Sequence, residues 1–272
     1  MQRDRICILL TGLALSAITS STLQGAEPTN AKEAAKRKAA KSYSEESDQA
    51  RKAKMSPAEL AWEKVLEENL GSFYLPRYKK AKQEGKVTAW DYVKDEPGLP
   101  RVLLIGDSIS RAYTLTVRKE LKGIANVHRA PANCGPTSTG LKKLSAWLGN
   151  GKWDLIHFNF GIHDRGTKPK DYAKRLEEIV VQLKKTGAKL VWASSTPLSE
   201  GTMKFKRGMM PPKNKIATGI MKKYGIPIND LYKVALPLIE KFQNKDGCHF
   251  KEQGNVELGK AVAAVIRREL KK

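Results

Sequence analysis

The sequence predicts a globular α/β domain from about residue 99 to residue 272, built as a parallel sheet of about five strands with helices on both faces. Along this stretch, short runs of branched apolar residues alternate with longer segments whose apolar residues recur at helical spacing. Such alternation is typical of a sheet whose strands are joined by crossover helices. The stretch also has the length of one domain.

The first strand of this domain is expected at residues 102–105, where four apolar residues follow Pro100 and end at Gly106. A run this short and this rich in branched side chains favours a buried parallel strand over a helix. Further strands are expected at residues 126–132, 154–160, 189–194 and 226–228. One helix is expected directly after Ser108, and further helices are expected at residues 141–148, 172–183, 214–224 and 258–266. Ligands of such sheets bind beyond the carboxyl ends of the strands, where Ser108 and Gly161 are expected.

Ahead of the domain, Arg3 and Arg5 precede an apolar run at residues 6–18, and small and polar residues follow as far as Ala26. This order is typical of a secretory signal peptide, predicted at residues 1–26. The apolar run is too short to span a bilayer comfortably, so we expect cleavage near Ala26 and no retained membrane anchor. An uncleaved tether is the alternative. The protein is then exported to the periplasm or the extracellular space.

Residues 27–55 consist mostly of Ala, Lys, Glu and Ser with almost no large apolar residue, so they are predicted to be a disordered linker. Residues 56–98 are interpreted as an arm. Ser56-Pro57-Ala58-Glu59 is a capping box that begins a helix, and aromatic residues interleaved with Lys follow it. Such a segment more often packs on its domain than binds a nucleic acid. We therefore expect no specific nucleic-acid partner.

Ser108 is expected at the turn between the first strand and the following helix. A serine there exposes its hydroxyl above the sheet, and the N–H groups at the start of the helix point toward any oxyanion formed nearby. This position suits a nucleophile. The alternative is that Asp107 and Ser108 only cap the helix, since both residue types are favoured at caps.

A serine hydroxyl needs a nearby base before it can attack a carbonyl at neutral pH. His128 and His157 lie inside expected strands, where a structural role is favoured. His249 lies in a loop before the last helix, and Asp246, three residues earlier, can fold back to hold its ring. The alternative is an ordinary exposed histidine in a turn.

Three blocks of the sequence, taken together, resemble those of the SGNH (GDSL-type) hydrolases. The blocks are Gly106-Asp107-Ser108, Gly161-Ile162-His163-Asp164 and Asp246-Gly247-Cys248-His249, in the family's order and near its spacing. The resemblance covers residues 99–272. It implies a flavodoxin-like three-layer α/β/α domain that hydrolyses acyl esters with a Ser-His-Asp triad and needs no metal or organic cofactor. Ser108 would be the nucleophile, His249 the general base and Asp246 its orienting partner.

The resemblance also implies an oxyanion hole made of two backbone N–H groups and one side-chain amide. Ser108 supplies the first N–H. Gly135 is the expected second donor, since glycine lets the backbone approach a ligand closely, and Asn133 is a weaker alternative. The third donor in the family is an asparagine, but this sequence has His163 there. An imidazole N–H can still donate, so we expect His163 to complete the hole.

The formal charge of +22 indicates acidic or polyanionic surroundings. Arg111, one helical turn after Ser108, is a candidate for contacting a charged substrate, and Asn133 and Asp164 are further candidates for contacting it. The basic segment 201–215 is interpreted either as a lid over the site or as a solvated loop, and the solvated loop is the more frequent case.

The sequence contains three cysteines, of which Cys7 would be removed with the signal peptide. Cys134 and Cys248 remain, and in an exported protein they can form a disulfide that joins two loops of the expected active site. Two free thiols are the alternative. A Cys-His protease is disfavoured, since neither cysteine lies at a strand-to-helix turn.

The sequence thus predicts a monomeric, exported serine esterase that acts on acylated small molecules or polysaccharides. Acetyl esters of carbohydrates are the first substrate class, and the substrate is expected to be anionic. Two alternatives remain: an O-acyltransferase of the same fold, and a non-catalytic protein that binds acidic polymers.

Overall fold

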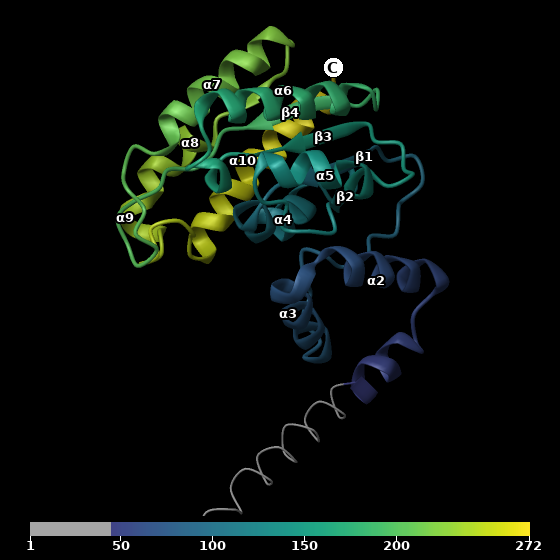
Figure 1. Ribbon diagram of the computed structural model, residues 1–272. Coiled ribbons are helices and arrows are strands. Elements are labelled where there is room, and N and C mark those ends of the chain that lie inside the picture. The colour runs from purple at the N-terminus through teal and green to yellow at the C-terminus, as the bar shows by residue number, and fades with distance from the viewer. Residues whose placement is uncertain (1–44) are drawn as a thin grey trace, which may run out of the picture. The chain divides into compact units, whose positions relative to one another are not determined.

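The structure is a computed structural model that describes residues 45–272, and residues 48–272 form one compact unit (Figure 1). The expected signal peptide and the expected linker up to residue 44 lie outside the described residues. The end of that linker differs from the expected disorder: it is helical at 45–52, and Arg51 pairs there with Asp48 at 2.7 Å and with Glu63 at 2.8 Å. Within the described part, no helix is both long and apolar enough to cross a bilayer.

A parallel sheet of five strands forms the centre of the domain and confirms the predicted fold class. The strands are β1 (Arg101–Ile105), β2 (Asn126–Arg129), β3 (Leu155–Phe158), β4 (Lys189–Ala193) and β5 (Ile228–Asn229). Their spatial order is β2-β1-β3-β4-β5. The winding therefore reverses between β1 and β3, and the carboxyl ends of these two neighbours flank the place where open sheets of this kind bind ligands.

Two groups of helices cover the two faces of the sheet (Figure 1). One face carries α4 (Ser108–Glu120), α8 (Leu231–Ala235) and α10 (Glu252–Leu270), and the other carries α5 (Thr137–Leu148), α6 (Pro169–Lys184) and α7 (Met210–Lys223). The single turns η1 (Ile162–Asp164), η2 (Leu236–Leu238) and α9 (Ile239–Phe242), like α8, were not expected. Segments this short contain too few residues for a helical period to show.

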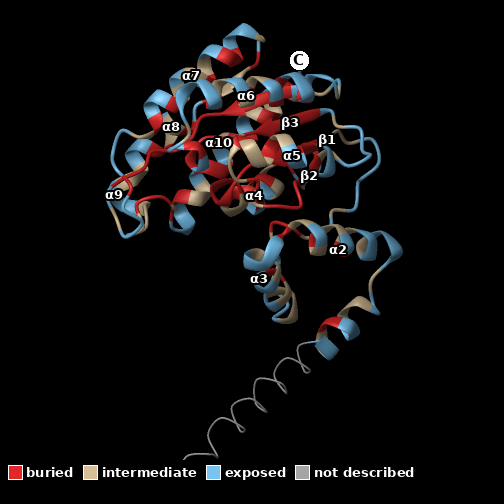
Figure 2. Ribbon diagram, in the orientation of Figure 1, coloured by how far each residue is buried: buried red, intermediate tan, exposed pale blue. Residues whose placement is uncertain are grey.

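The core divides along the strands, because successive side chains of a strand point to opposite faces of the sheet. In β1, Val102 and Leu104 belong to the hydrophobic cluster under α4 and α10, while Leu103 and Ile105 belong to the cluster under α5 and α6. All four are buried, and Figure 2 shows the buried residues concentrated in the strands and on the inner sides of the helices. The strands therefore form a rigid base for the loops at their carboxyl ends.

The arm consists of α2 (Pro57–Asn69), α3 (Gly71–Gln83) and a segment without regular structure at 86–100. The predicted capping box is present: the Ser56 hydroxyl accepts from the Glu59 N–H and the Glu59 carboxylate accepts from the Ser56 N–H. The arm packs on the domain. Arg118 of α4 donates to the carbonyls of Thr88 at 3.3 Å and Ala89 at 3.1 Å, which fixes the segment that precedes β1.

The buried ring of His157 in β3 should make the fold sensitive to acid. Asn229 Nδ2 donates to His157 Nε2 at 3.1 Å, and burial lowers the pKa of His157 from 6.5 to about 3. The unfolded chain therefore binds a proton at a higher pH than the folded protein does. Stability is full above pH 6.5 and falls by up to about 1.4 kcal/mol per pH unit between pH 6.5 and pH 3.

Urea denaturation at pH 6.5 and pH 5.0 tests this. Between these two values the wild-type protein should lose about 2 kcal/mol more unfolding free energy than His157→Gln, in which the position does not titrate. Equal losses in the two proteins would show that the imidazole is protonated in the folded state.

Candidate active site

Three residues far apart in the sequence meet beyond the carboxyl end of β1. The Ser108 Oγ lies 2.8 Å from His249 Nε2, and His249 Nδ1 lies 2.7 Å from Asp246 Oδ2. The carboxylate oxygen can only accept, so Nδ1 carries the proton and Nε2 is left to accept the hydrogen bond of the Ser108 hydroxyl. The arrangement can therefore remove a proton from Ser108.

The loop that carries Asp246 and His249 is shaped by its backbone. Asp246 Oδ1 accepts the N–H groups of Cys248 at 2.8 Å and His249 at 2.9 Å. Partial burial raises the pKa of Asp246, but these N–H groups and the His249 ring outweigh it and hold that pKa below its usual value. Gly247 has a φ of +77°, and a Cβ there would lie 2.2 Å from the Ser199 carbonyl oxygen, so only glycine fits this turn.

Ser108 lies at the first turn of α4, as expected. Asp107 caps this helix: its Oδ1 accepts the Ile109 N–H at 2.9 Å. The cap and the nucleophile candidate are therefore different residues, and the Ser108 hydroxyl remains available to His249. The Ser108 residue is 8% exposed.

Arg129, which the sequence reasoning did not single out, holds the turn before Ser108 from behind. Its guanidinium donates to the carbonyls of Gly106 at 3.0 Å and Asp107 at 2.9 Å, and to the Ser110 hydroxyl. It is buried, burial lowers its pKa, and no carboxylate of the described residues forms an ion pair with it. The signal that could have found it is a charged residue at the end of an apolar strand, because a buried charge must have hydrogen-bond partners.

The expected oxyanion donors lie around the same turn. The Cys134 N–H donates to the Gly106 carbonyl at 3.2 Å, which places the loop of Asn133 and Gly135 beside the turn, and Gly135 has a φ of +67°. The Oδ1 of Asn133 is buried without a hydrogen-bond partner. In the loop that follows β3, His163 Nε2 lies 3.9 Å from Asp107 Oδ2, next to the nucleophile candidate.

Asp164 does not face the site, which corrects its expected contact with substrate. It is fully buried, and its carboxylate accepts from the N–H of Thr137 at 2.8 Å, from the Thr137 hydroxyl at 2.7 Å and from the Thr167 hydroxyl at 3.2 Å. A carboxylate at the start of α5 satisfies N–H groups that the helix leaves free. Asp164 therefore connects the loop that follows β3 to the start of α5.

The expected disulfide is absent, because Cys134 and Cys248 are free thiols. Both are buried, but Cys134 packs in the cluster under α5 and α6, and Cys248 packs in the cluster under α4 and α10. They therefore belong to hydrophobic clusters on opposite faces of the sheet. Burial raises the pKa of each thiol to about 12, so both stay protonated at neutral pH.

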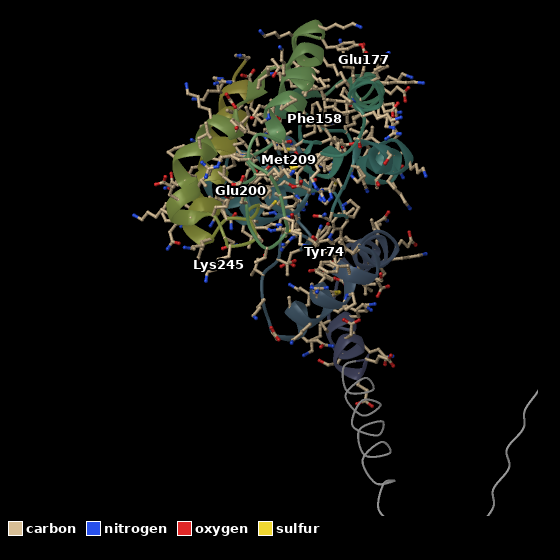
Figure 3. All side chains as sticks on the ribbon, turned by 60° about the vertical axis from the view of Figure 1, so that its left-hand side comes forward. Tyr74, Phe158, Glu177, Glu200, Met209 and Lys245 are labelled. Atoms are coloured by element: carbon tan, nitrogen blue, oxygen red, sulfur yellow. The ribbon has the colours of Figure 1, made fainter. Side chains whose placement is uncertain are left out.

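A cavity of about 490 Å³ lies between the arm and α4, and His249 lines its edge. The expected substrate residue Arg111 lines it as well, together with Tyr74 and Trp90 of the arm. Figure 3 shows Tyr74 on the arm, near the base of the α/β domain. Ser108 does not line this cavity, which adjoins the Ser108–His249 pair through His249.

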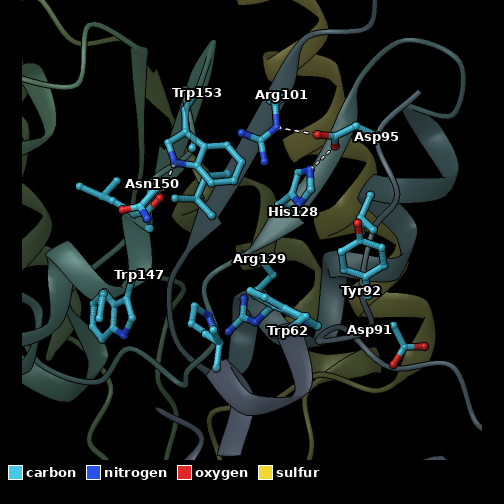
Figure 4. Close-up of a pocket in the computed structure, with 18 of the residues that line it drawn as sticks. Trp62, Asp91, Tyr92, Asp95, Arg101, His128, Arg129, Trp147, Asn150 and Trp153 are labelled. Carbon is cyan, nitrogen blue, oxygen red and sulfur yellow. Dashed lines mark hydrogen bonds and ion pairs between the residues drawn. The ribbon is translucent and has the colours of Figure 1, made fainter. Parts of the chain in front are cut away.

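A second cavity, of about 310 Å³, lies elsewhere on the molecule (Figure 4). Neither Ser108 nor His249 lines it. Its principal charged groups are already paired, since Asp95 contacts Arg101 at 2.8 Å and His128 at 2.6 Å. His128 thus has the structural role that the sequence favoured.

In the basic segment 201–215, the backbone packs on the loop that carries Asp246 and His249, while the side chains differ in exposure. The Thr202 N–H donates to the Lys245 carbonyl at 3.0 Å, and a Cβ on Gly201 would lie 2.5 Å from the same oxygen. Arg207 is exposed, while Lys213 is buried and donates to the Thr167 carbonyl. The segment therefore supports the loop of Asp246 and His249 through its backbone.

The sequence matches no family model and no curated protein. Solved structures do resemble it. An acetyl xylan esterase, AlAXEase, matches with a TM-score of 0.53 and 16% identity, over 61% of this chain and 99% of its own. A lipase/acylhydrolase from Enterococcus faecalis matches with a TM-score of 0.56 and 20% identity, over 63% of this chain and 97% of its own. A candidate SGNH hydrolase from Slackia heliotrinireducens matches with a TM-score of 0.51 and 19% identity, over 62% of this chain and 100% of its own. These likenesses show that the chain has an SGNH-type fold.

Proposed function

We propose that this chain, with its SGNH-type fold, is an exported hydrolase of carboxylic esters that works through an acyl-enzyme on Ser108. The observation that carries the proposal is the hydrogen-bonded series Ser108–His249–Asp246, with distances of 2.8 Å and 2.7 Å. A hydroxyl, an imidazole and a carboxylate in this order are the groups of a serine-hydrolase triad.

The proposed reaction has two halves. The Ser108 Oγ attacks the ester carbonyl while His249 Nε2 takes its proton, and the resulting imidazolium is stabilised by Asp246. The tetrahedral intermediate then collapses, the C–O bond to the alcohol breaks, and the alcohol leaves with the proton from His249. In the second half, water attacks the acyl-enzyme with His249 again as base, and the acid product leaves as Ser108 regains its proton.

Acetyl esters of carbohydrates are the proposed substrate class. The support is the likeness to a solved acetyl xylan esterase, and the open cavity beside His249, whose volume of about 490 Å³ accommodates one or two sugar rings. Export, which we propose from the sequence of residues 1–26, would place such an enzyme where carbohydrate polymers occur.

The oxyanion hole of the proposed enzyme consists of the Ser108 N–H, the Gly135 N–H and the His163 ring. His163 is the unusual member, and His163→Ala should lower kcat on an activated acetyl ester about a hundredfold, as expected for the loss of one oxyanion donor. His128→Asn, which changes an imidazole outside the site, is the control. Unchanged turnover in His163→Ala would leave that residue with a structural role only, and Asn133→Ala would then be the next variant to measure.

The direct test is a screen of acetyl esters together with labelling by a fluorophosphonate, which reacts covalently with activated serines. The mature protein should release acetate from acetylated xylan oligosaccharides, and peptide mapping should find the label on Ser108. No turnover of any ester and no label would contradict the proposal.

A further inference from the structure

We propose that the cavity between the arm and α4 binds a negatively charged group of the substrate, a carboxylate or a phosphate, through Arg111. This rests on the proposed function and specifies its substrate class: the enzyme would prefer acyl esters that carry a negative charge close to the ester group. The inference stands on three observations: the lack of partners of Arg111, the charge of the cavity lining, and the exposed apolar side chains around it.

The Arg111 guanidinium is held in place but forms no hydrogen bond or ion pair with the described residues, and its Nε is buried. Its Cζ lies 5.6 Å from the centre of the Tyr74 ring and 5.8 Å from that of Trp90, two rings of the arm. Aromatic faces of this kind attract a cation without using its N–H donors. The N–H donors of the two terminal nitrogens therefore remain free for a ligand.

Other arginines of the same region already donate from their terminal nitrogens to groups of the protein, although Arg129 Nε, like Arg111 Nε, is buried without a partner. Arg101 pairs with Asp95, Arg118 donates to carbonyls of the arm, and Arg129 donates to the carbonyls that precede Ser108. A planar guanidinium with several free donors matches the two oxygens of a carboxylate or a phosphate. Arg111 is thus set apart from its neighbours in a way that fits binding of an anion.

The charge of the cavity wall agrees with this. Arg77, Lys86 and Arg111 line it, while no aspartate or glutamate does. Nothing in the wall would repel an anionic group. Since Arg111 lies one helical turn after Ser108, about 5 Å along the axis of α4, the anion should be carried within about one sugar unit of the scissile ester.

Exposed apolar side chains also gather at this cavity. Nine large apolar side chains of residues 45–272 are exposed, and three of them, Phe73, Val87 and Leu115, line it. Exposed apolar surface that gathers at a cavity is typical of a binding site. A ligand with an anionic group and an apolar face, such as an acylated acidic sugar, matches both features of the wall.

The test compares three acetyl esters built on one ring: neutral methyl glucoside, methyl glucuronoside with its carboxylate, and methyl glucoside 6-phosphate, each with one acetyl group. The wild-type protein should hydrolyse at least one anionic ester with a kcat/KM at least about tenfold above that of the neutral one. The preferred ester identifies the anion as carboxylate or phosphate. The preference should shrink as salt is added, because ions screen the attraction.

The Arg111→Gln variant should lose this preference, with kcat/KM on the anionic ester falling about 10- to 100-fold and by more than kcat/KM on the neutral ester, so that the ratio of the two approaches one. Arg111→Lys should retain part of it. Arg175→Gln removes the same charge from α6, on the opposite face of the sheet, and should leave the preference intact. Circular dichroism of each variant checks its fold.

The outcomes separate the two proposals. If none of the three esters and no activated acetyl ester is hydrolysed, the proposed function fails. If the esters are hydrolysed equally well and Arg111→Gln affects them alike, the enzyme stands and the anion site is wrong. Equal turnover combined with Arg111-dependent binding to vesicles of anionic phospholipid would assign the cavity to a membrane surface and overturn the soluble-substrate proposal.

Discussion

Replacing Ser108 by alanine should reduce the hydrolysis of an activated acetyl ester by roughly ten-thousand-fold or more, because the variant has no atom that can form the acyl-enzyme. The Ser108 Oγ is the group that His249 Nε2 contacts at 2.8 Å. The substitution removes one buried oxygen, so the fold and the denaturation midpoint should change little. Release of acetate and incorporation of a fluorophosphonate label measure the loss.

Two comparisons make this result specific. Ser145→Ala changes an exposed serine on α5 and should keep full activity. His249→Ala should cost about as much as Ser108→Ala, and the double variant should cost no more than either single one, because residues that act as a unit lose their function together. If Ser108→Ala kept more than about a tenth of the activity, another group would have to be the nucleophile.

Asp246→Asn should lower kcat by roughly ten-thousand-fold while leaving the size and shape of the side chain unchanged. The wild-type carboxylate accepts the proton of His249 Nδ1 at 2.7 Å and so fixes the neutral ring with Nε2 free. An asparagine amide facing Nδ1 donates instead, which places the ring proton on Nε2, where it can no longer accept the proton of Ser108.

The pKa of Asp246 decides where this effect should hold. Hydrogen bonds from the Cys248 and His249 backbone outweigh burial and keep the pKa below its usual value, so the carboxylate is ionised throughout the neutral and mildly acidic range. A deficit of Asp246→Asn should therefore be present at every pH between 6 and 8. Asp171→Asn, on the exposed side of α6, is the matched control, and wild-type activity in Asp246→Asn across this range would show that the carboxylate does not orient His249.

The arm gives this molecule a feature beyond the layered domain. It contributes Tyr74 and Trp90 to the wall of the cavity at His249, and Arg118 anchors it to α4 through the carbonyls of Thr88 and Ala89. The arm thus positions the rings that hold Arg111 without using its hydrogen-bond donors. Substrate selection in this protein would then depend on the arm, while the chemistry would depend on the loops at the carboxyl ends of the strands.

Local patterns in the sequence were sufficient to predict the elements whose defining residues lie within a few positions of one another. The strand ending at Gly106, the capping box at Ser56 and the amphipathic helix α6 each depend on residues within a few positions of one another, and all three are present. The boundaries were less well predicted. β2 ends at Arg129 and not at residue 132, since apolar residues in a loop beside the core resemble the end of a strand.

The side chains whose roles depend on distant neighbours were harder to predict. Asp164 is a charged residue in an expected active-site loop and was predicted to contact substrate, but its carboxylate accepts hydrogen bonds from Thr137 at the start of α5. Cys134 and Cys248 lie in two loops of the expected active site, where a disulfide was possible, but they are free thiols that pack in different hydrophobic clusters. Such roles depend on which face of an element a residue occupies and on what packs against it, and one sequence does not contain that information.

The sequence by itself determined the alternation of strands and helices, the turn that presents Ser108, and the loop in which Asp246 lies three residues before His249. Only the tertiary structure decided that Ser108 and His249, 141 positions apart, lie within hydrogen-bonding distance, and that Arg111 has no partner among the described residues. The physical reason is that hydrophobic periodicity and turn preferences act between neighbours in the chain. Contacts across the sheet arise only when all of the strands and helices pack around one core.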